Sequence, residues 1–171
     1  MVLDAPPGYA DTTFTGSPRL QELAESLTSA SNRILLFAVS DADLRRFSVG
    51  DPPEFRRYML IATPRTLERE RLSPAAFKRL AEESLPALAP LPEGTDIGKH
   101  LEGRPVGAPT PLAELARQPA AVSLLVGTRL EPTKVPRMFG SEERQNFMLA
   151  SSTLLHLRGK ALNLSVFSML H

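Results

Sequence analysis

Apolar residues recur with the period of an amphipathic helix at two places in the chain. At both places a serine followed by proline precedes the repeat, at Ser17-Pro18 and at Ser73-Pro74. The serine hydroxyl can accept a hydrogen bond from an unpaired backbone N–H, and proline suits the first helical position. Apolar side chains then follow at the i, i+3, i+4, i+7 spacing, which places them on one buried stripe. These signals predict helices over residues 18–29 and from residue 74 onward.

The same signature recurs more weakly further along the chain. Thr110-Pro111 repeats the hydroxyl–proline pair and predicts a short third helix, which Pro119 ends. Ser40 with Asp43 three residues later resembles a capping box and predicts a turn or short helix.

Continuous or alternating apolar runs predict the strands. Residues 34–39 are an uninterrupted apolar run too short for an independent helix, which favours a central strand covered on both faces. Residues 57–63 resemble this run, and residues 122–130 alternate apolar with smaller or polar side chains.

A long hairpin is predicted at the end of the chain. Residues 145–157 and 160–170 are two strand-like stretches, and Gly159 supplies the conformational freedom for the turn between them. Both faces of the first stretch are partly apolar. This pattern indicates that something packs on each side of the sheet.

Residues 86–111 form the least regular part of the chain. They contain six of the 16 prolines and four of the ten glycines, without a hydrophobic period. A loop of this length inside a compact domain is often a binding element. Because neither side of this segment has enough strands to fold alone, residues 1–171 are predicted to form a single domain.

The order of elements predicts an α+β fold: an antiparallel sheet of four to six strands with helices packed on it, similar to an α/β/α sandwich. With its opening Ala5-Pro6-Pro7-Gly8-Tyr9 and its closing hairpin, the chain resembles the photosystem II extrinsic subunit family and its Ran-binding relatives. With Arg57-Tyr58 it also resembles uncharacterised exported proteins of proteobacteria. The resemblance implies an exported accessory or binding protein and carries over no catalytic residue.

Composition excludes several kinds of chemistry. The chain has no cysteine and only three histidines, so thiolate catalysis and cysteine-based metal sites are excluded, and we expect neither metal nor cofactor. Basic and acidic residues number 20 and 19, which argues against nucleic acid as a partner. No apolar run is long enough to span a membrane.

Two residue pairs could in principle carry chemistry. Asp96 and His100 lie four residues apart, a metal-binding spacing on a helix, but Gly94 and Gly98 argue against a helix there. Ser152 and His156 share one face of a predicted strand and are the only serine–histidine pair in a well-defined element that could form a hydrolase site.

Arginines flank the connection between the first two strong strand predictions. If these strands pair, the arginines gather at one end of the sheet, where they could bind an anion or ligand. Alternation with nearby acids, giving surface ion pairs, is the simpler interpretation. The candidate binding residues of the whole chain are Arg45, Arg46, Arg56, Arg57, Tyr58, Asp96 and His100.

The sequence therefore favours a non-enzymatic protein that binds a protein partner or small ligand through residues 86–111 and a sheet edge. A hydrolase using Ser152 and His156 is one alternative, and anion or nucleic-acid binding at the arginines between Arg45 and Arg57 is another. The family resemblance implies a periplasmic or secreted protein. Because the chain begins without the pattern of a signal peptide, a cytoplasmic location is the alternative.

Overall fold

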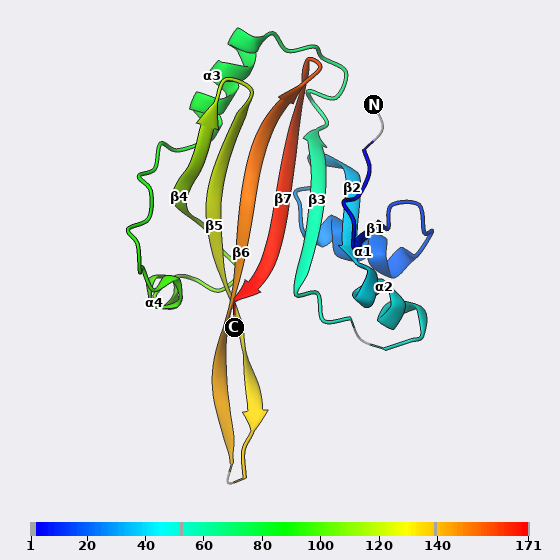
Figure 1. Cartoon of the computed structure of the whole chain (residues 1–171), viewed down its shortest axis with the longest axis vertical. Coiled ribbons are helices and arrows are strands. Elements are labelled where there is room, and N and C mark those ends of the chain that lie inside the picture. Colours follow the sequence, from blue (N-terminus) through cyan, green and yellow to red (C-terminus); the bar gives the residue numbers. More distant parts are fainter. Residues whose placement is uncertain (1–2, 52, 139, 171) are drawn as a thin grey trace.

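A single antiparallel sheet dominates the computed structural model, which describes residues 3–51, 53–138 and 140–170. Within these residues the sheet has seven strands in the order β1-β2-β3-β7-β6-β5-β4, and four short helices accompany it (Figure 1). In chain order the elements are β1 (Tyr9–Asp11), α1 (Pro18–Ser26), β2 (Asn32–Ser40), α2 (Asp41–Ser48), β3 (Arg57–Pro64), α3 (Pro74–Ser84), α4 (Ile97–Glu102), β4 (Pro109–Gln118), β5 (Ala121–Pro136), β6 (Ser141–Leu157) and β7 (Lys160–Leu170).

The predicted fold class is wrong. We expected four to six strands with helices packed on both faces of the sheet, and the described residues form seven strands with only short helices. One extra strand arises at β4, where a helix was expected. The antiparallel pairing itself is confirmed for every neighbouring pair of strands.

Hydroxyl caps begin three of the helices, as the sequence predicts. The Oγ atoms of Ser17 and Ser73 accept from backbone N–H groups at the starts of α1 and α3, and Pro18 and Pro74 occupy the first helical positions. α1 ends at Ser26, three residues earlier than predicted.

The third cap, at α2, links Ser40 and Asp43 by two hydrogen bonds. Ser40 Oγ accepts from the Asp43 N–H at 3.1 Å and donates to the Asp43 carboxylate at 2.8 Å. The other carboxylate oxygen of Asp43 accepts from the N–H of Glu54 at 2.7 Å. Asp43 therefore ties the start of α2 to the connection that leads into β3.

Strand β2 is buried on both faces but is not central. Its four consecutive residues Leu36, Phe37, Ala38 and Val39 are each at most 1% exposed, which confirms the predicted double cover. The central strand of the seven is β7, however, and β2 lies next to the short edge strand β1.

The predicted helix at Thr110-Pro111 is wrong, because this segment is strand β4 paired with β5. Proline is tolerated there because β4 is an edge strand, where a missing N–H need not break a ladder. The predicted loop at residues 86–111 instead contains α4, which Asp96 caps by accepting from the Lys99 N–H.

The two faces of the sheet are covered differently. The helix face carries α1, whose Leu20 and Ala24 join a buried cluster with Phe37, Val39, Tyr58 and Leu60. It also carries α3, whose Phe77 ring stacks on His156 of β6 with centroids 5.1 Å apart. We call the opposite side the open face.

On the open face, α4 covers one end of the sheet. Leu101 is fully buried, and a Cβ built on Gly127 of β5 would lie 2.7 Å from its Cδ1 atom. The absence of a side chain at Gly127 therefore lets α4 approach the sheet closely. Figure 1 shows β5, β6 and β7 running uninterrupted across the view, with no helix in front of their middle portions.

Two hairpins shape the outline of the molecule. The predicted turn between β6 and β7 is confirmed at Arg158 and Gly159, which both have positive φ. Strands β5 and β6 extend well beyond the rest of the sheet as a two-stranded ribbon, which projects from one end of the body (Figure 1). We call residues 131–138 and 140–145 of this ribbon the arm.

No helix in the part of the chain that the structure describes is long and apolar enough to cross a membrane.

Candidate functional site

The serine and histidine of the predicted hydrolase site do not come together. Ser152 and His156 both point to the helix face, but four residues of strand separate them by about 13 Å, too far for a hydrogen bond between their side chains. The Oγ of Ser152 donates to the amide oxygen of Asn163 instead.

His156 is held by structural contacts. Its Nε2 atom lies 2.9 Å from the carbonyl oxygen of Leu72, so this nitrogen carries the proton and donates. The stacked Phe77 ring fixes the plane of the imidazole. The geometry gives no support to a Ser152–His156 catalytic pair.

Three of the four predicted arginines do gather at one end of the sheet. Arg46, Arg56 and Arg57 line a cleft of about 470 Å³ together with Tyr9 and Ser168, whereas Arg45 is not among its lining residues. The cleft lies where α2 and the connection before β3 meet the end of β7. The sequence predicted that pairing of β2 with β3 would bring the arginines together. This prediction holds for three of the four.

Glu54 neutralises part of this cluster. Its carboxylate lies 2.6 Å from Arg46 and 2.5 Å from Arg56. The hydrogen bond from Arg46, followed in size of effect by the one from Arg56, holds the pKa of Glu54 below its ordinary value. Because the pairs are exposed, each contributes little to stability. Arg57 has no acidic side chain within salt-bridge distance among the residues that the structure describes.

Tyr58 does not accompany the arginines at the surface. Its side chain is 7% exposed, its ring stacks on Phe167 with centroids 4.8 Å apart, and its hydroxyl donates to the sulfur of Met148. Burial raises the pKa of Tyr58 to about 12. Arg57 and Tyr58 are neighbours on a strand and point to opposite faces, so this predicted binding residue is part of the core.

His100 belongs to α4 and Asp96 caps it, contrary to the expectation that Gly94 and Gly98 prevent a helix. Asp96 is occupied as the N-cap. Among the described residues, no group of three or more metal-ligating side chains comes together at this or any other place.

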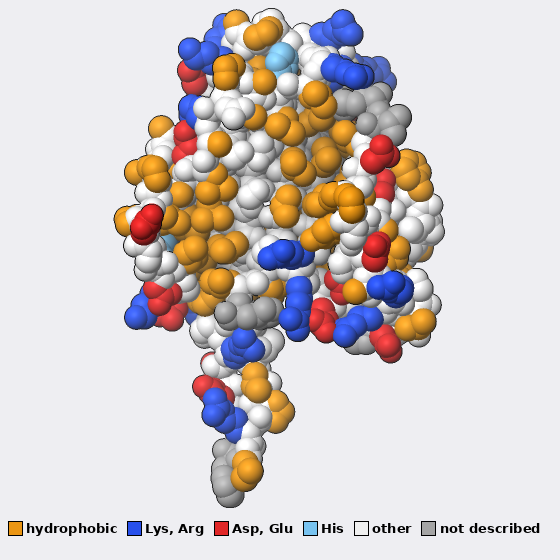
Figure 2. Space-filling view, in the orientation of Figure 1, with side chains coloured by type: hydrophobic (Ala, Val, Ile, Leu, Met, Phe, Trp, Pro, Cys, Tyr) orange, Lys and Arg blue, Asp and Glu red, His pale blue; other side chains and the backbone are white. Residues whose placement is uncertain are grey.

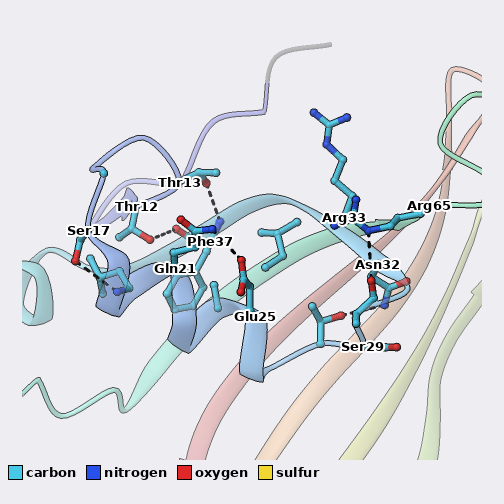
Figure 3. A pocket seen from close by; sticks show the side chains of 16 residues that line it. Thr12, Thr13, Ser17, Gln21, Glu25, Ser29, Asn32, Arg33, Phe37 and Arg65 are labelled. Atoms are coloured by element: carbon cyan, nitrogen blue, oxygen red, sulfur yellow. Dashed lines mark hydrogen bonds between the residues drawn. The ribbon is translucent and has the colours of Figure 1, made fainter.

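A further cleft lies beside α1 and has a volume of about 520 Å³ (Figure 3). Its polar side chains bond to one another across its wall: Gln21 donates to Glu25, and Asn32 donates to Thr28. Arg65 donates to the carbonyl of Ala30, and Arg33 pairs with Glu68. These bonds satisfy the polar groups without a ligand, so we assign no binding role to this cleft.

The open face was not among the sites predicted from the sequence. On β7 and β6 its side chains alternate with those of the helix face, and pairing fixes which side each takes. Most of them are half-buried. Across the middle four strands the open face consists of Met59, Ile61, Leu162, Leu164, Val166, Leu149, Ser151, Thr153, Leu155, Ser123 and Leu125.

No charged side chain lies among these eleven residues, but Arg57 of β3 and Arg129 of β5 lie on the same side of the sheet, beyond their lower end. Figure 2 shows two groups of hydrophobic side chains on this side of the molecule, one over β4 and β5 and one over β7 and β3. A strip with fewer hydrophobic side chains separates them. By register, Ser151 and Thr153 of β6 lie on this side of the sheet between β5 and β7. Thr153 is hydrogen-bonded to Ser123 at 2.8 Å.

The arm carries further exposed apolar side chains. Met138, near its tip, is 93% exposed, and Val135 is 39% exposed. Beyond Leu130 and Asn146 the two strands of the arm pair only with each other.

Comparison of the chain with family models, with curated proteins and with solved structures finds no match. The resemblance to the photosystem II extrinsic subunit family, and the export that it implies, stay predictions.

Sequence reasoning missed the open face because its residues carry no chemical motif. One signal was present: both faces of residues 145–157 are partly apolar, which indicated cover on both sides. The structure supplies helices on one side and leaves the middle of the other without them.

Proposed function

We propose that this chain is a protein-binding module whose contact surface is the open face. The observation that carries the proposal is the reversed polarity of the central strand. On β7, Leu164 and Val166 point to the open face, whereas Asn163 and Ser165 point to the helix face.

This polarity is unusual for a sheet face in contact with water. Antiparallel sheets with one solvated face normally place polar residues on that face. Large exposed apolar patches on a folded protein mark sites of interaction. The open face therefore has the composition of a surface that another molecule covers.

The total surface of the chain is large for its mass. Its accessible surface is 10966 Å². A compact monomer of 18.7 kDa exposes about 8,300 Å² by the usual scaling with mass. The chain therefore exposes about a third more surface than a compact monomer of its mass.

The absence of charge from the middle of the open face indicates the kind of partner. A strongly acidic or basic partner would need opposite charges on the surface that it meets. A partner with an apolar surface and hydroxyl groups fits the open face better. The predicted role of residues 86–111 as a contact loop is not needed, because α4 anchors part of this segment to the sheet.

Co-purification with paired variants tests the proposal. Tagged wild-type chain, Val166→Lys and Asn163→Lys are expressed in the same host, and the bound proteins are compared. Val166 and Asn163 lie on the same strand and face opposite sides, so the two lysines add the same charge. We expect Val166→Lys to lose the partner and Asn163→Lys to retain it. Equal recovery of every bound protein by all three chains would contradict the proposal.

A further inference from the structure

We propose that an apolar pocket on the helix face binds a small neutral molecule that carries a carbonyl oxygen. The pocket lies on the opposite side of the sheet from the open face, so this inference does not rest on the proposed function. Three features carry it: the lining of the pocket, the hydroxyl of Tyr58 and the backbone of Phe55.

The pocket has a volume of about 330 Å³ and an almost entirely apolar lining. Its walls come from α1, from the ends of five strands and from the connection before β3, and of the described residues that line it only Glu54 is charged. The Glu54 carboxylate is already engaged by Arg46 and Arg56. Ligand sites in proteins are concave, mostly apolar and at least about 300 Å³ in volume. At the roughly 30 Å³ that a water molecule occupies in the liquid, this pocket has room for about ten non-hydrogen atoms of a neutral ligand.

Tyr58 supplies the polar group of the pocket. Its side chain is 7% exposed, and its hydroxyl donates to the sulfur of Met148 at 3.0 Å, where both residues line the pocket. A buried tyrosine hydroxyl usually finds a hydrogen-bond partner, but a thioether is only a weak acceptor. Burial raises the pKa of Tyr58 to about 12, so the hydroxyl keeps its proton at neutral pH. A carbonyl oxygen in the pocket gives this proton a stronger acceptor than the one it has.

One wall of the pocket can adjust to a ligand. Met148 and Met169 lie opposite each other in the β6–β7 pair, and both line the pocket. Methionine is unbranched and polarizable, and it is common at adaptable binding surfaces. A rotation of Met148 therefore frees the Tyr58 hydroxyl for a ligand with the loss of only a weak hydrogen bond.

Phe55 borders the pocket in a strained conformation. Its φ is 45°, in the left-handed region that bulky side chains rarely adopt. One carboxylate oxygen of Asp43 holds this turn by accepting from the N–H groups of Glu54 and Phe55, at 2.7 and 3.3 Å. The Phe55 ring meets Tyr58 edge-on, with centroids 6.2 Å apart. Strain of this kind clusters at ligand-binding sites, and here it places an aromatic ring beside the hydroxyl.

Nuclear magnetic resonance of the methionine methyl groups locates the binding site. The full chain, labelled with ¹³C at these methyl groups, is titrated with acetophenone, which joins an aromatic ring to a carbonyl oxygen. We expect the signals of Met148 and Met169 to shift along one saturable curve. Met59 on the open face and Met138 in the arm are internal controls whose signals should stay in place. Substitution of each methionine by leucine in turn assigns the signals.

Tyr58→Phe tests the hydrogen bond. Isopropylbenzene is close to acetophenone in size and shape but has no acceptor. We expect Tyr58→Phe to weaken acetophenone binding about fivefold, which corresponds to one net hydrogen bond, and not to weaken isopropylbenzene binding. Tyr9→Phe is the matched control at the other tyrosine and should change neither, because Tyr9 does not line the pocket. Thermal unfolding establishes that both variants are folded.

The possible outcomes are distinct. Absence of any shift at Met148 and Met169 up to millimolar acetophenone overturns the inference, as do shifts of equal size at Met59 and Met138. If Tyr58→Phe weakens both probes equally, or weakens neither, the assigned hydrogen bond is wrong and the inference fails with it. Loss of a partner by the open-face variants in co-purification is measured separately, so either proposal can fail without the other.

Discussion

At the scale of single residues, Tyr58 is notable because its titratable hydroxyl is buried. Its hydroxyl meets the sulfur of Met148, and its ring lies between Phe167 and the edge of Phe37. Removing this phenol from water disfavours its charged form, so the pKa of Tyr58 is raised from 10.0 to about 12. The stability of the fold is linked to this shift.

Because the folded-state pKa of Tyr58 is the higher one, its contribution to stability is complete below pH 10 and is lost as the pH rises toward 12. The free energy of unfolding should therefore fall in this window. The chain has two tyrosines and no tryptophan, so in Tyr9→Phe the tyrosinate absorbance reports Tyr58 alone. We expect a midpoint near 12. A midpoint near 10 with unchanged circular dichroism would show that the ring is not buried.

Residue-scale features were predictable wherever they depend on near neighbours in the chain. Ser17, Ser40 and Ser73 cap the helices that the sequence assigned to them. The Ser152–His156 pair failed because a shared strand face does not bring residues four positions apart into contact. The distance follows from strand geometry, so the spacing alone argues against the pair.

At the scale of elements, the arm is the least supported part of the fold. Two-stranded ribbons without a third strand or a packed face are only marginally stable. The arm is tied together by few side-chain contacts, among them a hydrogen bond from Asn146 to the carbonyl of Glu131 and the ion pair of Arg137 with Glu142. We expect it to open far more readily than the body of the sheet.

Amide hydrogen exchange measures this difference directly. In the isolated chain, the amides of the arm should exchange much faster than those of β5 residues 122–128, which pair on both sides. Equal protection along the whole of β5 would mean that the arm is covered in solution by something outside the described structure.

Two elements were misread for a common physical reason. Thr110-Pro111 has the local signature of a helix start, but pairing with β5 makes the segment a strand. Residues 97–102 have the glycines of a loop, but burial of Leu101 against Gly127 makes them a helix. In both cases a contact with β5, distant in sequence, overrides the local preference, and no local pattern reports such contacts.

At the scale of the whole molecule, the sequence predicted an antiparallel sheet with helices but not their distribution. Alternation along β6 indicates two partly apolar faces, and it does not say whether a helix of this chain or another molecule covers each one. The strand count failed for a related reason, since β4 and β1 owe their existence to their neighbours in the sheet. The distribution of helices leaves the open face as the central feature of the molecule.

Whether the open face is covered in the cell can be measured with thiols placed on the two sides of β7. The chain has no cysteine, so Val166→Cys and Asn163→Cys each introduce a single thiol, one on each side of β7. Their rates of reaction with a maleimide are compared in dilute purified protein and in the host cell. We expect the Val166→Cys thiol to be protected in the cell and to react after dilution, whereas the Asn163→Cys thiol reacts in both. Equal reactivity of the two thiols in the cell would contradict the claim that the open face is a contact surface.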